Sequence, residues 1–272
     1  MNYKRLTPAF SMLELVFVIA ILGIVASIGA EMIVKVYEGY IVQRAEHRAT
    51  IKTELAATQI ANRLVSAIPG TVVRRITPTG AIEDINDDML LDPTGLSYTV
   101  LQWVASDMDS YSATATPGWS GFCDIDDPLN TANSLSTPGS SLGTTVAIIN
   151  NLSGSGQTPK IYFPYDSNEY NASIAGTTIT LSGAGAPHIV EHYKLAWTSY
   201  ALVVENGDLY LYYDFPAIPA VGFANAPKSL LLSNVSAFKF KGDGRAIRFK
   251  ICKEERIGDD LNVSACKEKA VF

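Results

Sequence analysis

Two groups of side chains have the residue types of a metal site. Acidic residues gather in 83–88, 107–109 and 124–127. Loop carboxylates ligate calcium at about 2.3–2.6 Å, but none of these runs has the EF-hand spacing. Solvated acidic loops are therefore expected, with calcium as the alternative. His188 and His192 have the four-residue spacing of zinc ligands on a helix. The segment around them predicts a strand, so no metal or other cofactor is expected.

The three cysteines could do redox chemistry or form a cross-link. Cys252 and Cys266 enclose thirteen residues that predict a loop. In an oxidising compartment, a bond between them would stabilise the fold by about 3 kcal/mol on the loop-closure model. Cys123 could compete as a partner, and three free or buried thiols are the other interpretation. The choice depends on where the chain is targeted.

The composition argues against two large classes of protein. The net charge is −6, whereas nucleic-acid binders depend on Lys and Arg contacts with phosphates. With three histidines, no Ser–His–Asp set and no glycine-rich phosphate loop before a helix, nothing indicates an enzyme. Trp103, Trp119 and the tyrosines are interpreted as core or interface residues rather than a sugar platform.

An apolar segment near the N-terminus could anchor the chain in a membrane and so decide on which side the residues above lie. Residues 10–30 carry one charge, Glu14, and are long enough to cross about 30 Å of hydrocarbon. Lys4 and Arg5 precede them, which keeps the N-terminus cytoplasmic and places the rest outside. A secretory signal peptide cleaved near Ser27 and a simple uncleaved anchor are two interpretations. Neither explains Glu14, which costs about 3 kcal/mol in an apolar zone.

A third interpretation accounts for the whole segment, F-S-M-L-E-L-V-F-V-I-A-I-L-G-I with its preceding basic residues. It resembles the type IV prepilin signature: a basic leader with Lys4 and Arg5, a small residue Ala9, then Phe10 as new N-terminus and Glu14 as the fifth mature residue. The family usually has Gly where this chain has Ala9. The resemblance implies cleavage between Ala9 and Phe10 by a prepilin peptidase, and methylation of the Phe10 amine.

The resemblance also gives Glu14 a role in assembly. A positive amine on Phe10 and a negative Glu14 are each unfavourable alone in a low dielectric, and pairing offsets part of that cost. Between two chains the pair would set the axial register of neighbouring helices. A pair within one chain is the alternative, since the residues are four apart.

The same segment has small residues at spacings of three and four, a pattern that lets helices approach closely in lipid: Ala20, Gly23, Ser27 and Ala30. The alternative is that Gly and Ala are simply common in membrane helices. Many major pilins have a proline near the position of Glu31, and its absence predicts a more continuous helix.

The expected fold is α+β, with a long N-terminal helix packed on an antiparallel β-sheet domain. After a leader at 1–9, the helix has a transmembrane half at 10–30 and a periplasmic half at 31–68, ended by Pro69-Gly70. Its 59 residues would span about 90 Å. Two helices with a hinge near Gly39 are the alternative.

The periplasmic domain is expected at 69–272. Residues 106–156, rich in Ser, Thr and Gly, predict a surface-loop insertion on the sheet. The sequences E-N-G-D and K-G-D-G-R predict two hairpins. Strands are predicted at 71–76, 98–104, 145–149, 177–181, 198–205, 209–215, 235–241 and 246–250. The closing C-K-E-K-A-V-F predicts a last strand held by the disulfide.

The hairpin runs Y-A-L-V-V-E-N-G-D-L-Y-L-Y-Y-D and L-L-L-S-N-V-S-A-F-K-F-K-G-D-G are similar to the J-type minor pseudopilins of type II secretion and the W-type minor pilins. The resemblance implies a single-pass inner-membrane subunit with a periplasmic domain. Its partners would be the prepilin peptidase, other pilins or pseudopilins and the inner-membrane assembly platform. K-type tip subunits commonly lack the glutamate, so Glu14 implies a place below the tip. An adhesive or ligand-binding subunit acting through 106–156 is the alternative.

Overall fold

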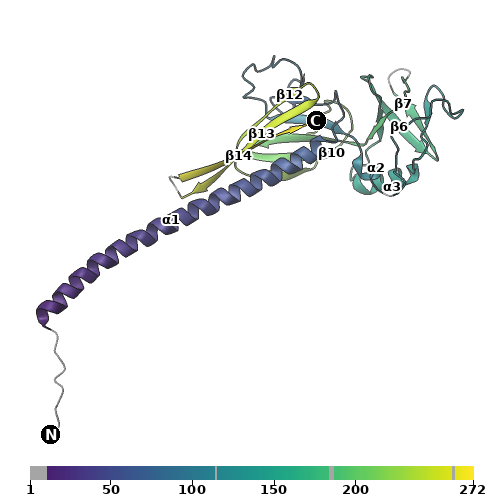
Figure 1. Cartoon of the computed structure of the whole chain (residues 1–272). Helices are drawn as coiled ribbons and strands as arrows, with labels where there is room; N and C mark the ends of the chain where they lie inside the picture. Colours follow the sequence, from purple (N-terminus) through teal and green to yellow (C-terminus); the bar gives the residue numbers. More distant parts are fainter. Residues whose placement is uncertain (1–10, 114, 184–186, 259–260) are drawn as a thin grey trace, which may run out of the picture.

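The computed structural model describes residues 11–113, 115–183, 187–258 and 261–272. It combines one long N-terminal helix with antiparallel β-sheets, as the sequence predicts (Figure 1). The helix extends away from the rest of the chain, and the β-rich part gathers at its C-terminal end (Figure 1). The architecture is α+β.

Helix α1 spans Met12–Leu64 without a break at Gly39, so the two-helix alternative is wrong. It ends four residues before the predicted end at Ile68. The cap residue Val65 donates its N–H to Ala61, and the Ile68 N–H donates to the Val104 carbonyl at 2.9 Å. The chain thus leaves the helix early because a neighbouring strand takes over its backbone hydrogen bonds.

The largest sheet has six antiparallel strands in the order β11-β10-β9-β3-β1-β2. The predicted Asn206-Gly207 hairpin between β9 and β10 is confirmed. Both turn residues have positive φ, 52° and 83°, as a type I′ turn requires. The strand bounds are β1 Val73–Arg75, β2 Glu83–Asp84, β3 Val100–Ala105, β9 Thr198–Glu205, β10 Asp208–Phe215 and β11 Lys228–Leu232.

A second sheet consists of β12 (Val235–Asp243), β13 (Ala246–Ile257) and β14 (Leu261–Val271). The predicted disulfide joins Cys252 to Cys266, which lie directly opposite each other on β13 and β14 with Cα atoms 4.0 Å apart. The residues between them extend these two strands, so the expected loop is wrong. The predicted last strand is present as β14.

One face of α1 packs on these sheets, mainly against β13 and β14. Small side chains at the start of that face let the helix approach closely. Larger ones at its end join a core that contains Trp103, Leu202 and Phe249. The buried residues of α1 recur every three or four positions: Ala45, Ala49, Thr53, Ala56, Ala57, Ile60 and Leu64.

The predicted loop insertion is instead a folded unit between β3 and β9, and it extends to residue 197. Its five-stranded antiparallel sheet has the order β4-β7-β6-β5-β8. The unit has its own core, which includes Trp119, Leu135, Ile161 and Tyr170. Its elements are α2 Met108–Tyr111, β4 Ser134–Ser136, α3 Leu142–Leu152, β5 Lys160–Tyr162, β6 Glu169–Ala175, β7 Thr178–Ser182 and β8 Lys194–Ala196. We call residues 106–197 the insertion unit.

The strand predicted at 145–149 is wrong, because these residues lie in helix α3. The β-branched run favours a strand locally. The buried residues of α3 are Leu142, Thr145 and Ile149, spaced three and four apart, which is the periodicity of a helix packed on one face. Tertiary packing therefore overrides the local preference.

The insertion unit is fixed to the six-stranded sheet by Asp214 of β10, a buried residue in the left-handed region with φ 54°. Its carboxylate accepts hydrogen bonds from the Ser153 hydroxyl at 3.0 Å and the Ser155 N–H at 3.0 Å. Nearby, the Tyr162 hydroxyl donates to the Ala217 carbonyl at 2.6 Å. These contacts place the insertion unit beside the end of α1 remote from Met12 (Figure 1).

Candidate functional site

The first part of α1 is exposed on all sides. Among the described residues it is the one helix long and apolar enough to cross a membrane, with a mean hydropathy of 2.5 and no buried residue in its apolar window. Residues 12–30 would extend about 28 Å as a helix, close to the thickness of a bilayer core. The structure is therefore compatible with a single-pass anchor.

Glu14 lies in the first turn of α1, where a negative charge interacts favourably with the helix dipole. The Ser11 hydroxyl caps this turn by accepting from the Leu13 N–H at 3.2 Å. Ser11 and Glu14 also have the S-x-x-E spacing of a capping box, which is a local sequence signal for the start of a helix. Glu14 forms no ion pair with a described residue. Ala9 and Phe10, the predicted cleavage residues, lie outside the described residues.

The predicted small residues and Glu14 lie on different faces of α1. At 3.6 residues per turn, Ala20, Gly23, Ser27 and Ala30 fall within an arc of about 80°, and Glu14 lies about 160° from its centre. A Cβ atom added to Gly23 would meet no atom within 4 Å beyond the neighbouring backbone of its own helix. This face of α1 is therefore not covered by another part of the chain. Glu14 and the small-residue face would therefore contact different neighbours.

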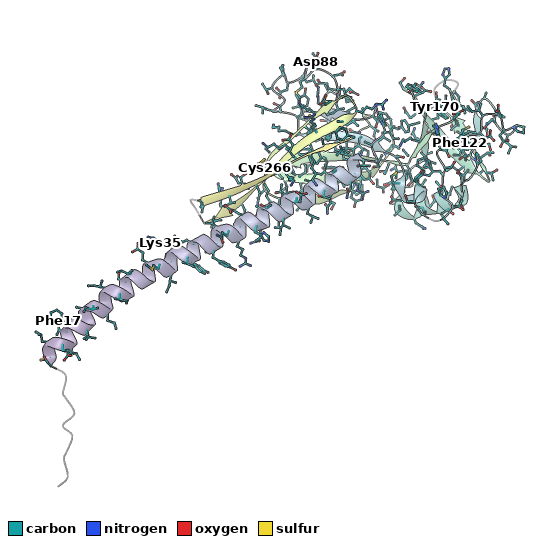
Figure 2. The ribbon with its side chains drawn as sticks, viewed as in Figure 1. Phe17, Lys35, Asp88, Phe122, Tyr170 and Cys266 are labelled. Atoms are coloured by element: carbon teal, nitrogen blue, oxygen red, sulfur yellow. A yellow bond between two sulfur atoms is a disulfide. The ribbon has the colours of Figure 1, made fainter. Side chains whose placement is uncertain are left out.

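A further apolar stripe continues α1 beyond the membrane-length segment. We call Met32, Ile33, Val36, Tyr37 and Tyr40 the outer stripe; each has 58% or more of its surface exposed. Its angular centre lies about 150° from that of the face that packs on the sheets. The outer stripe thus points away from the rest of the chain, and this part of α1 projects freely around Lys35 (Figure 2).

The packed end of α1 is joined to the last strand by ion pairs. Glu54 contacts the Nζ atoms of Lys267 at 2.7 Å and Lys269 at 2.9 Å. Hydrogen bonds from Lys267 and then Lys269 lower the pKa of Glu54 to about 2. Lys269 also donates to the Thr58 hydroxyl at 2.8 Å. The C-terminal strand is therefore held on the helix by polar as well as apolar contacts.

Two of the predicted acidic loop residues are structural rather than solvated. Glu83 is buried and contacts Arg74 at 2.5 Å, and it accepts hydrogen bonds from the Tyr98 hydroxyl and from the Leu90 N–H at 3.0 Å. Burial tends to raise the pKa of Glu83, but these hydrogen bonds outweigh it and lower the pKa to about 2. Asp107 is also buried, and its burial raises the pKa of its carboxyl group.

The other residues whose types could bind a metal do not come together. Within the part of the chain that the structure describes, no group of three or more His, Cys, Asp or Glu residues is arranged to hold a metal ion. His188 and His192 are exposed and lie outside any helix. Asp127 accepts a hydrogen bond from the Ser136 hydroxyl at 2.6 Å. Cys123 is a buried free thiol whose pKa is raised by burial.

A cavity of about 770 Å³ lies where the end of α1, the six-stranded sheet and the insertion unit meet. We call it the junction cavity. Sequence reasoning missed it because its residues are far apart in the chain. Trp103, predicted as a core or interface residue, is fully buried and lies at the cavity wall. At the rim, the Arg63 guanidinium lies over the Tyr200 ring, 5.0 Å from its centroid, and donates to the Tyr200 hydroxyl at 2.9 Å.

No model of a known protein family matches this chain, and searches of curated proteins and of solved structures found no match.

Proposed function

We propose that this chain is a structural subunit of a type IV pilus-like or type II secretion filament, a minor pilin or minor pseudopilin. Prepilin peptidase would cut between Ala9 and Phe10, and Glu14 would dock the subunit onto its neighbour. The proposal rests on the resemblance of the N-terminal segment and on the continuous helix Met12–Leu64, half free and half packed on a β-rich domain.

The outer stripe is the strongest structural support for this proposal. A bilayer accounts for the exposed apolar residues of about the first 28 Å of α1, but the outer stripe lies beyond that length. Contiguous exposed apolar residues mark surfaces that bind another apolar surface. A bundle of parallel copies of α1 would cover the outer stripe, whereas a simple anchor would leave it in water.

The faces of α1 also suit a bundle. The Glu14 face and the small-residue face of Ala20 and Gly23 point in roughly opposite directions, so one helix can contact two neighbours at once. Heterologous contacts of this kind, in which different faces meet, generate open helical filaments when the rotation does not close. An isolated anchor needs neither face.

The experiment begins with the mature N-terminus. N-terminal sequencing should find N-methyl-phenylalanine at Phe10, and a start after Gly29 or an intact Met1 would reject processing by prepilin peptidase. Glu14→Ala should be processed normally but lose co-purification with filament partners. The matched control is Glu38→Ala, an exposed glutamate on the same helix. Equal losses in both variants would contradict a docking role for Glu14.

A second candidate function is an adhesive or ligand-binding subunit, and the folded insertion unit favours it. A separate core gives residues 106–197 the stability to present a surface of their own. The test is to replace the whole unit by a short turn between Ala105 and Thr198, which pair directly in the sheet. Removing 106–156 alone would leave β5–β8 without Trp119, Leu135 and Ile149. Loss of surface binding with retained assembly would favour this function.

A further inference from the structure

The outer face of the three-stranded sheet, on the side away from α1, gathers positive charge. Lys239 pairs with Lys250 across β12 and β13, and Lys241 pairs with Arg248. Directly opposite residues of an antiparallel pair point to the same side, so all four lie on one face, whereas Phe249 between them is buried in the core. Like charges directly opposite each other destabilise a sheet. We call these four residues the basic face.

Two carboxylates on the same side neutralise part of this charge. Asp243 contacts Arg248 at 3.1 Å, and Glu268 lies opposite Lys250 on β14. Lys241 and Lys250 are exposed and form no ion pair with a described residue. The basic face therefore keeps a net positive charge, on a chain whose net charge is −6.

An exposed apolar segment borders the basic face. The Gly242 N–H of β12 donates to the Ile85 carbonyl at 3.2 Å, and the Lys239 Nζ donates to the Leu96 carbonyl. The chain between these two acceptors thus runs beside β12. Its leucines are exposed to solvent: Leu90, Leu91 and Leu96. Basic and apolar side chains are presented next to each other on this surface.

The insertion unit carries the opposite charge, with eight acidic residues against two basic ones. The Cys123 N–H donates to the Glu191 carbonyl at 2.7 Å, which brings Glu191 beside the loop at 124–127. We call Asp124, Asp126, Asp127 and Glu191 the acidic patch. Exposed apolar residues lie in and next to the same loop: Phe122, Ile125 and Leu129. The acidic patch and its surroundings thus complement the basic face in charge and in apolar character.

Other anionic surfaces fit the basic face less well. Lysines of β14 contact Glu54, which lies about 36 Å along α1 from Ala30, so the bilayer that would hold residues 12–30 is out of reach. A nucleic acid offers phosphates but no apolar surface for the leucines beside β12. Within one chain the two surfaces are separate, since Phe122 of the insertion unit lies well apart from Cys266 of the three-stranded sheet (Figure 2).

We propose that the basic face of one copy docks on the acidic patch of a second copy of this chain, head to tail. The insertion unit lies beyond the end of α1 (Figure 1). A copy shifted forward along the helix axis therefore brings its three-stranded sheet level with the insertion unit of the copy behind it. Because the two surfaces differ, each copy can make the contact twice, and association continues as a row. The contact uses no residue of α1, so it stands whether or not Glu14 docks the helix.

The test is sedimentation velocity of the full chain in detergent micelles, in about 0.1 M and about 1 M sodium chloride. Exposed charges interact over about 10 Å at the lower salt concentration and about 3 Å at the higher one. The chain should associate as its concentration rises in the lower salt, and this association should weaken at least about tenfold in the higher salt. A chain that stays a single copy in the lower salt, even at millimolar concentration, would overturn the proposal.

Charge exchange identifies the two surfaces. Lys241→Glu with Lys250→Glu should weaken association at least about tenfold, because carboxylates then face carboxylates, and Asp126→Lys with Glu191→Lys should do the same from the other side. An equimolar mixture of the two variants should associate again, which also shows that both are folded. The matched control, Arg256→Glu, changes an exposed residue on the same strand and side as Lys250, about 20 Å further along, and should leave association unchanged.

Carbodiimide coupling gives a second measurement. It joins a lysine amine to a carboxylate as an amide, with loss of water, when the two groups are in contact. In an equal mixture of ¹⁴N-labelled and ¹⁵N-labelled chains, mass spectrometry should find Lys250 joined to Asp126 or Glu191 in pairs of mixed isotope. Pairs of a single isotope alone would mean contact inside one chain and would contradict the proposal.

Two further results would reject this contact. The first is a pair of charge-exchanged variants that both associate like the unchanged chain, or whose mixture stays unassociated. The second is an association that Glu14→Ala abolishes and the charge reversals spare. That result would assign the association to α1 and leave the proposed function in place.

Discussion

The buried pair of Glu83 and Arg74 makes the sharpest stability prediction. Replacing Glu83 by Gln leaves the Arg74 guanidinium, 1% exposed, without its carboxylate. Breaking a buried ion pair from one side costs about 3–5 kcal/mol, because the remaining charge stays desolvated. Replacing both residues by apolar ones of similar volume, Arg74→Met with Glu83→Leu, should recover most of the loss for the same reason.

The assay is urea unfolding of the full chain in nanodiscs, followed by tryptophan emission, to which Trp103 in the adjoining core contributes. The matched control is Asp88→Asn, an exposed carboxylate of the same acidic segment, which should change the unfolding free energy by less than about 0.5 kcal/mol. A loss below about 1 kcal/mol for Glu83→Gln would refute the burial of this pair. A double variant no more stable than Glu83→Gln would refute the role of the unpaired charge.

The same pair predicts a pH dependence. The pKa of Glu83 is lowered from 4.5 to about 2, so its carboxylate contributes stability that is fully present above about pH 4.5. That contribution is lost as the pH falls toward 2. The stability difference between the wild-type chain and Glu83→Gln should therefore shrink across this window and stay constant above it. A difference that grows on acidification would contradict the assigned charge state.

Two other predictions follow from the C-terminal strand. Replacing both Cys252 and Cys266 by Ser should lower the unfolding free energy by about 3 kcal/mol in the urea assay, while Cys123→Ser should leave the mobility of the oxidised chain unchanged on non-reducing gels. Glu54→Gln should release the lysines of β14 and speed amide hydrogen exchange in that strand, whereas Glu46→Gln, on the same helix without an ion pair to a described residue, should not. Unchanged exchange in the Glu54 variant would mean that apolar packing alone holds the strand.

Local signals in the sequence predicted the elements whose geometry is set locally. Asn206-Gly207 correctly predicted the hairpin of β9 and β10, because a type I′ turn needs two positive φ values and these two residues tolerate them. The helix was recognised from its apolar run and the absence of proline. Cys252 and Cys266 were paired correctly, although the residues between them belong to strands and not to a loop.

Features that depend on distant residues could not be predicted. The segment 106–156 is poor in apolar residues, and its core forms only when they join Ile161, Tyr170 and Leu195 from the following strands. Glu83 looked like one of several solvated acids, because its partner Arg74 lies nine residues away on a neighbouring strand. The residues of the junction cavity come from α1, α2 and four strands, so no local sequence pattern indicates it.

The order of synthesis gives the packing of α1 on β14 a further consequence. The helix leaves the ribosome well before β14 (Leu261–Val271) does. At 5–20 residues per second, the segment between them takes roughly 10–40 s to synthesise. During that time the face of α1 that carries Ala49, Ala56 and Ile60 lacks β14 as part of its cover, so this apolar face of the nascent chain is open to non-native contacts until that strand is made.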